Sequence, residues 1–150
     1  MKYSLIFILL IVGSFGLSKA QYTSEQKVII EHNVRERLDQ LMELVKRKHY
    51  QGFGKMMAYT GRDPNRAMQD KLNLYNPHEK LEAELALNEL AHHLDKSALW
   101  HADNFRIVKA LQNEMYIFDM EFTYIKGKTK KYKVTFMKLE DEILFCHADK

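Results

Sequence analysis

The sequence predicts an α+β domain in which helices pack on an antiparallel sheet. Three observations carry this prediction. Apolar residues recur at helical spacing between residues 23 and 94, they alternate at a spacing of two between residues 105 and 148, and no linker or low-complexity tract separates the two halves. We therefore expect a single domain over residues 21–150, with N-terminal helices packed on a four-stranded antiparallel meander.

Residues 1–20 have the pattern of a cleaved secretory signal. Lys2 supplies a basic start, residues 5–17 form an uncharged apolar run, and the small residues Ser18 and Ala20 stand at positions −3 and −1 of the cleavage site. The apolar run is too short to span a bilayer comfortably. We expect an exported protein, either periplasmic in a Gram-negative bacterium or secreted.

Composition limits the partners of the mature chain. The full chain has 23 basic and 20 acidic residues and a net charge of +3; Lys2 and Lys19 lie in the signal, which leaves 21 basic residues and a net charge of +1. This balance gives no global electrostatic reason to expect nucleic acid or an anionic membrane as a partner. Cys146 is the only cysteine, so neither an intrachain disulfide nor a lipid anchor at the new N-terminus is expected. No later segment is apolar enough for membrane insertion.

Two helices are predicted before residue 60. The first begins after Thr23, whose hydroxyl can form a capping box with Gln26. Its apolar stripe consists of Ile30, Val34, Leu38, Leu41 and Val45. A second, short helix is expected from Tyr50 to Tyr59, where Gly52 and Gly54 lower the helix propensity.

Capping signals mark two further helix starts. Asp63 can cap a short helix that begins at Pro64. Asn76 can cap the main helix, because Pro77 follows at its first position and Glu79 at its third. The core stripe of the main helix consists of Ala83, Leu87, Leu90 and Leu94. Leu81 and Leu85 lie on the opposite face, so we expect that face to be covered by a loop or a second subunit.

Four strands are predicted in the C-terminal third. The clearest runs from residue 116 to 125, where large apolar side chains alternate with Asp119, Glu121 and Thr123. The others are expected at residues 105–111, 132–139 and 143–148, separated by polar turns. Alternation defines two faces of the sheet, but it does not tell which face is concave.

This order of elements resembles the NTF2-like (SnoaL-like) superfamily. The helical start with Arg47-Lys48-His49-Tyr50 followed by Phe53, and the closing hairpin from Phe136 to Asp149, are similar to that family. The resemblance implies a curved sheet that wraps helices into a cone with a pocket, and an exported bacterial member without known activity. It does not by itself give a function.

The candidate catalytic residues are His147, Asp119 and Glu121. Asp119 and Glu121 lie two apart on one strand face, and two carboxylates inside a pocket would form an acid–base pair. His147 is predicted to share a face with Ile143 and Phe145. The alternative is that His147 is a buried structural residue and that both carboxylates face solvent, since the opposite face of their strand is apolar.

An aromatic wall is the candidate ligand site. Such a wall can grip a small apolar or aromatic ligand, although it can equally be filled core. The residues expected to line it are Tyr116, Phe118, Phe122, Tyr124, Trp100 and Tyr59. Trp100 can close the mouth of a pocket or plug the end of the cone. No metal site and no cofactor are expected, because the histidines lack the spacing of a ligand set.

Three other groups have structural interpretations. Arg66 is expected to pair with Asp70 rather than to bind an anionic ligand. Cys146 is expected to be a buried thiol, with His147 on the other face of the strand. The lysines of one hairpin tip are interpreted as a guard against edge pairing rather than as a nucleic-acid site. They are Lys126, Lys128, Lys130, Lys131 and Lys133.

Three functions follow, in order of preference. The first is a non-enzymatic binding module for a small molecule or a protein, with a homodimer expected. The second, implied by the resemblance, is a SnoaL-like acid–base enzyme of the isomerase, cyclase or dehydratase type. The third is a cystatin-like interaction module, which the long helical first half disfavours.

Overall fold

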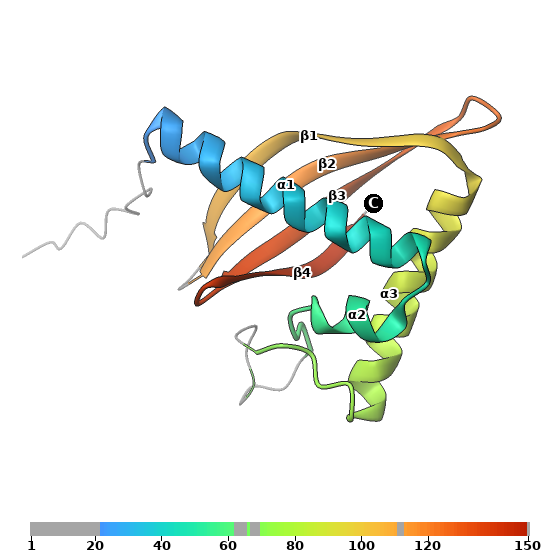
Figure 1. The fold of residues 1–150 in the computed structure, drawn as a ribbon, viewed down its shortest axis with the longest axis horizontal. Helices are drawn as coiled ribbons and strands as arrows, with labels where there is room; N and C mark the ends of the chain where they lie inside the picture. Colours follow the sequence, from blue (N-terminus) through green and yellow to red (C-terminus); the bar gives the residue numbers. More distant parts are fainter. Residues whose placement is uncertain (1–21, 62–65, 67–69, 111–112, 150) are drawn as a thin grey trace, which may run out of the picture.

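The structure, a computed structural model, describes residues 22–61, 66, 70–110 and 113–149. The elements in chain order are α1 (Ser24–Lys46), α2 (Tyr50–Lys55), α3 (Pro77–Lys96), β1 (Ser97–Ala110), β2 (Asn113–Tyr124), β3 (Thr129–Leu139) and β4 (Glu142–Asp149). The strands form one antiparallel sheet in the order β1-β2-β3-β4. α1 crosses one face of this sheet obliquely, and α3 runs across its end (Figure 1). The predicted α+β class is confirmed, and the arrangement is consistent with the NTF2-like fold that the sequence predicted.

The start of α1 is fixed by the predicted capping box. The backbone N–H of Gln26 donates to the Thr23 hydroxyl at 3.2 Å, and the Thr23 N–H donates to the Gln26 side chain at 2.9 Å. These bonds satisfy two amides that have no partner within the helix. The side chains buried along α1 are Val34, Leu38, Leu41, Met42 and Val45.

The start of α3 also follows the prediction. The Asn76 side chain accepts from the His78 N–H at 3.0 Å, and Pro77 occupies the first turn. Leu81 and Leu85 are 51% and 61% exposed, so the described residues leave this face of α3 uncovered. The short helix predicted at Pro64 lies outside the described residues.

The sheet differs from the prediction at both edges. β1 begins at Ser97, directly after α3, instead of near residue 105. Its first half has only Ala102 fully buried, so it lacks the apolar alternation by which a strand is found. At the other edge, the helix predicted up to Tyr59 ends at Lys55.

The segment after α2 pairs with the edge of β4 instead of continuing the helix. The Ala58 N–H donates to the Phe145 carbonyl at 2.8 Å, and the Phe145 N–H donates to the Met56 carbonyl at 2.7 Å. The Leu72 N–H in turn donates to the Met57 carbonyl at 3.0 Å. Hydrogen bonds formed by the tertiary structure thus replace those of one further helical turn.

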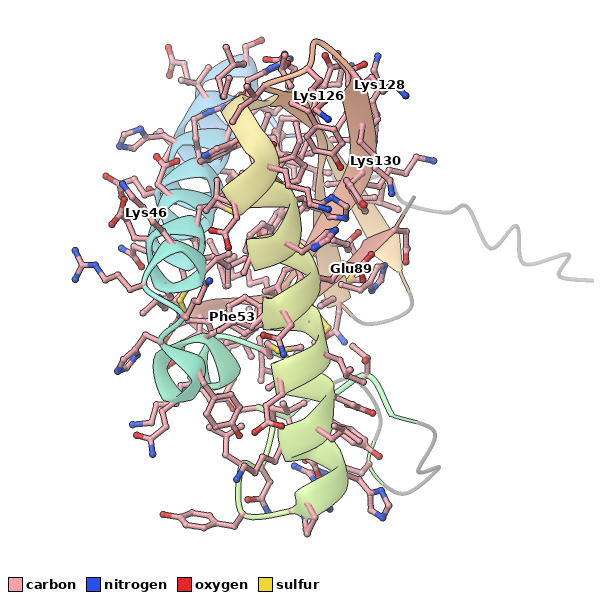
Figure 2. All side chains as sticks on the ribbon, turned by 90° about the vertical axis from the view of Figure 1, so that its right-hand side faces the viewer. Lys46, Phe53, Glu89, Lys126, Lys128 and Lys130 are labelled. Atoms are coloured by element: carbon pink, nitrogen blue, oxygen red, sulfur yellow. The ribbon has the colours of Figure 1, made fainter. Side chains whose placement is uncertain are left out.

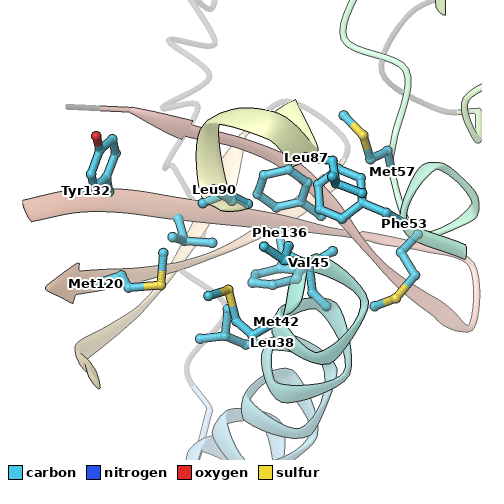
Figure 3. Close-up of a cluster of buried hydrophobic side chains, with 14 of the residues drawn as sticks. Leu38, Met42, Val45, Phe53, Met57, Leu87, Leu90, Met120, Tyr132 and Phe136 are labelled. Carbon is cyan, nitrogen blue, oxygen red and sulfur yellow. The ribbon is translucent and has the colours of Figure 1, made fainter. Parts of the chain in front are cut away.

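The face of the sheet that meets the helices is apolar. Phe118, Met120 and Phe122 of β2 are at most 1% exposed and belong to the main core cluster with α1 and α3. We call this the inner face and the opposite one the outer face. Figure 3 shows Leu38, Met42 and Val45 of α1 beside Met120 and Phe136 of the sheet, with Phe53, Leu87 and Leu90 closing the cluster from α2 and α3.

A bulge in β4 changes which residues share a face. Thr135 pairs with His147, whereas the next residue, Phe136, pairs with Phe145, so Cys146 is the extra residue. Phe145 and Ala148 pack in the main core, which places His147 on the outer face. The prediction that His147 shares a face with Phe145 is therefore wrong, because strict alternation does not continue through a bulge.

Candidate functional site

The inside of the predicted cone is occupied by the protein itself. Tyr116, Phe118 and Phe122, which we expected to line a ligand pocket, are 2%, 0% and 0% exposed. The buried stripe of α1 packs against them in one cluster. Tyr59 is also buried, at 9% exposure, and its ring lies 4.5 Å from the Arg66 guanidinium. In this structure these four aromatic side chains contribute to packing.

Two arginines hold α1 on the inner face of the sheet. Arg35 Nη1 donates to the Ala102 carbonyl of β1 at 2.8 Å, and its guanidinium lies 4.9 Å from the centre of the Phe118 ring. Arg37 Nε donates to the Ile143 carbonyl of β4 at 2.9 Å. The helix is thus fastened to both edge strands, which keeps its apolar stripe against the sheet.

A third contact fastens the chain just before α1. The Tyr22 hydroxyl donates to the Glu114 carboxylate, which also accepts from the Tyr116 hydroxyl at 2.9 Å. The hydrogen bond with Glu114 raises the pKa of Tyr22 to about 12. Burial, followed by the bond with Glu114, raises the pKa of Tyr116 above its usual range. Both hydroxyls therefore stay protonated at neutral pH and act as donors.

A buried histidine lies between two tyrosines at the end of the cone. His93 of α3 is 6% exposed; its Nδ1 lies 2.6 Å from the Tyr124 hydroxyl, and its Nε2 lies 2.5 Å from the Tyr132 hydroxyl. The His93 and Tyr124 rings are stacked, with centres 6.1 Å apart. This arrangement satisfies a buried imidazole. The sequence pattern indicated only a surface or satisfied histidine, because His93 sits among polar residues at the end of α3.

The three candidate catalytic residues lie on the outer face, away from the helices. Asp119 forms a two-bond ion pair with Arg106, at 2.7 and 3.0 Å, and also accepts from Asn104 at 3.1 Å. The hydrogen bonds from Arg106 hold the pKa of Asp119 below its usual range. Glu121 pairs with Lys131 at 3.2 Å.

His147 is engaged with a neighbour on its own strand. Its Nε2 lies 2.9 Å from the Asp149 carboxylate, and its side chain is 39% exposed. Asp119 and Glu121 line an open hollow of about 310 Å³ on the outer face, together with His101, Asp103 and Lys131. The structure brings the two carboxylates to one surface, as their spacing predicted, but not to the interior of the cone.

The ionisable groups Arg66 and Cys146 have structural roles. Arg66 pairs with Asp70 at 3.4 Å, as predicted, and also with the buried Glu79, which accepts from the Asn73 N–H at 2.6 Å. Burial raises the pKa of Cys146 to about 12, so its thiol is protonated and poorly nucleophilic.

The remaining predicted ligand-binding residue, Trp100, lines a hollow of about 450 Å³. Three elements form this hollow. α1 contributes Asp39, Met42, Glu43 and Lys46, α3 contributes Leu94 and Asp95, and β1 contributes Trp100. We call it the Trp100 hollow. It lies where the C-terminal halves of α1 and α3 meet the start of the sheet.

The Trp100 hollow combines an apolar base with acidic walls. Met42 is 3% exposed, whereas Asp39 and Glu43 stand one helical turn apart on the exposed side of α1. Asp95 contacts Lys48 Nζ at 3.0 Å, and Glu43 contacts Arg47 at 3.5 Å, both on the surface. Sequence reasoning singled out Trp100 but missed the carboxylates, since polar residues beside a buried stripe are ordinary in a surface helix.

The described residues contain neither a metal-ligand cluster nor a membrane-spanning helix. Among residues 22–61, 66, 70–110 and 113–149, no group of three or more His, Cys, Asp or Glu side chains is placed to hold a metal ion. Within the same residues, no helix combines the length and the apolar character needed to cross a bilayer.

Comparison with known proteins gives weak structural likeness and no match in sequence. No family model matches the sequence, and no curated protein matches it. Among solved structures, the chain is similar to a variant of the designed NTF2 protein Rd1NTF2_05, at 12% sequence identity and a TM-score of 0.47. The aligned region covers 80% of this chain and 97% of the designed chain. Nothing about function follows from a likeness at this level.

Proposed function

We propose that this protein is a non-enzymatic binding module that takes a small organic cation in the Trp100 hollow. The observation that carries the proposal is the composition of that hollow, which combines an indole, an apolar base and three carboxylates. Among the described residues Asp39 forms no ion pair, whereas Glu43 and Asp95 each also pair with a cation at the surface. A bound cation is attracted by the face of an aromatic ring as well as by nearby carboxylates. Ligand sites commonly pair apolar walls with a few charged groups in this way.

The acid–base enzyme is the less supported alternative. It requires a carboxylate or an imidazole that faces a ligand and is free to exchange a proton. Asp119 is held by Arg106, Glu121 by Lys131 and His147 by Asp149, and none of them lines the Trp100 hollow. The cystatin-like alternative has one helix on the sheet, whereas three helices precede the sheet in the described part of this chain.

Trp100 itself provides the test, because it is the only tryptophan in the sequence. The experiment is a titration of the protein with choline while the tryptophan emission is recorded. The control ligand is 3,3-dimethylbutan-1-ol, which has the shape of choline without its charge. We expect a saturable change in emission with choline and a much weaker one with the alcohol. Equal responses to both would contradict the proposed cation site.

Matched variants locate the binding. The double variant D39N/E43Q removes two carboxylates from the hollow and should weaken choline binding about tenfold or more, as expected when two charged partners of a cation are lost. E25Q/E36Q is the control, because it removes the same two charges from exposed side chains of α1 that lie outside the hollow. If this control weakens binding as much as D39N/E43Q does, the carboxylates act at long range and the site lies elsewhere.

Export and dimer formation are further parts of the proposal. The signal at residues 1–20 lies outside the described residues. Mass spectrometry of the protein recovered from an exporting bacterium tests the signal, and we expect the recovered chain to begin at Gln21.

The homodimer is supported by the exposed Leu81 and Leu85 on α3. Light scattering of the purified protein tests the homodimer, and a monomer across the micromolar range would contradict it.

A further inference from the structure

The turn between β2 and β3 carries an unusual concentration of positive charge. Residues 124–132 contain four lysines and no acidic residue. The turn is tight: the Tyr124 N–H donates to the Lys128 carbonyl at 2.8 Å, and Gly127 adopts a φ of 78°, which glycine tolerates best. The Ile125 N–H donates to the Lys96 carbonyl at 3.2 Å, so Lys96 at the end of α3 joins the group. We call residues 124–131 together with Lys96 the basic tip.

The basic tip projects from the body of the protein. Figure 1 shows the β2–β3 loop extending past the end of α3, and Figure 2 shows Lys126, Lys128 and Lys130 toward the same end of the molecule. Lys126 and Lys128 are exposed, and neither forms an ion pair with another described residue. The mature chain is almost neutral overall, so the positive charge at this tip is balanced by negative charge elsewhere in the chain.

The guard against edge pairing that the sequence suggested accounts for only some of these lysines. A guard protects an edge strand, whose backbone groups are unpaired. β2 is paired along both of its sides, whereas β3 is paired with β4 only from Lys133 onward, so among the described residues Thr129–Tyr132 have a partner on the β2 side alone. A guard can therefore account for Lys130 and Lys131, but Lys126 and Lys128 stand in the turn, where no strand edge needs protection. Sequence alone could not reveal this, because the lateral order of the strands is a tertiary property.

Exposed aliphatic side chains accompany the charges. Ile125, at the start of the turn, is 75% exposed, and Leu99, whose strand partner is Thr123, is 54% exposed. A β-branched aliphatic residue is not one of the residues that turns favour. Lysines beside protruding aliphatic groups are the combination that binds the surface of an anionic bilayer, because the cations meet the headgroups while the aliphatic groups enter the interface.

We propose that the basic tip docks peripherally on a bilayer rich in anionic phospholipid, without spanning it. A nucleic acid fits less well, since single strands are held by aromatic rings free to stack on bases. The tyrosines that flank the turn are not free in this sense: Tyr132 is 2% exposed, and the hydroxyls of Tyr124 and Tyr132 both contact His93. The tip is also convex, which suits a flat surface.

Vesicle flotation tests the proposal with the chain from Gln21 onward, which leaves the described core between Ile30 and Ala148 intact. The probes are vesicles of phosphatidylcholine alone and vesicles with equal parts of phosphatidylglycerol. We expect binding to the anionic vesicles only, and loss of that binding at about 1 M salt, where charges are screened within a few ångströms. Equal binding to both vesicles, or none to either, would overturn the proposal.

Two sets of variants separate the basic tip from the rest of the surface. K126E/K128E/K130E should lower vesicle affinity by at least about tenfold, since each basic residue near an anionic surface contributes about fivefold. K55E/K109E/K138E makes the same change in net charge at exposed lysines away from the tip and should lower affinity much less. Equal losses in the two sets would show a global charge effect and refute docking by the tip.

The aliphatic part of the proposal has its own variant. I125S keeps every charge and should lower vesicle affinity several-fold without changing its dependence on salt, because burial of apolar groups in the interface is not screened. Circular dichroism checks that each variant is folded. Retention on heparin with no binding to anionic vesicles would instead identify a polyanion partner and overturn the lipid proposal.

Discussion

The two faces of β2 differ in how they are stabilised, although the same twelve residues form both. On the inner face, Phe118, Met120 and Phe122 are excluded from water by α1 and α3. On the outer face, Asp119 and Glu121 reach charged partners on β1 and β3 across the surface. Burial of large apolar groups stabilises by several times more than exposed ion pairs do. The inner face should therefore determine the stability of the fold.

The largest effect is expected from F118A on the inner face. Removal of a fully buried aromatic ring should lower the free energy of unfolding by about 3–5 kcal/mol. The adjacent residue Ile117 lies on the outer face of the same strand and is only partly buried, so I117A is the matched control with a clearly smaller loss. Denaturation in urea measures both. Similar losses for the two variants would mean that the outer face is covered as well.

A smaller effect is expected from the buried polar contact at His93. Y132F keeps the ring but removes the hydroxyl that lies 2.5 Å from His93 Nε2. The loss of this hydrogen bond to a buried polar group should lower the free energy of unfolding by about 1–3 kcal/mol. Y75F makes the same chemical change at a side chain that is 99% exposed and should have no measurable effect. A neutral Y132F would show that water or another group replaces the hydroxyl.

The smallest effect is expected on the outer face, from D119N. The Asp119–Arg106 pair is partly exposed, so its loss should cost less than about 1 kcal/mol at neutral pH. Because folding lowers the pKa of Asp119, the ionised carboxylate stabilises the folded state at pH values above its unfolded pKa. This stabilisation is lost as the pH falls through the folded pKa. Stability curves of the two proteins should therefore converge in acid. A difference in the free energy of unfolding that stays constant down to strongly acidic pH would point to another cause.

The elements with local signals could be predicted from sequence. Thr23 with Gln26 and Asn76 with Pro77 marked the starts of α1 and α3, because capping depends on residues within one turn. β2 was found by its alternation. The candidate site was predicted only in part: Trp100 was singled out, but its neighbours Asp39 and Asp95 come from separate helices, and nothing local brings them together.

The sequence by itself determined α1, α3, the central strands, the α+β class and the burial of Cys146, since periodicity and capping are set by neighbouring residues. Only the tertiary structure decided that α1 fills the cone, that Asp119, Glu121 and His147 lie outside it, and that β2 and β3, which form the lysine-rich hairpin, are the two inner strands of the sheet. These features depend on which face of the sheet receives the helices, on a bulge at Cys146, and on the lateral order of the strands. All three are set by contacts between residues distant in the chain, which the order of residues does not display.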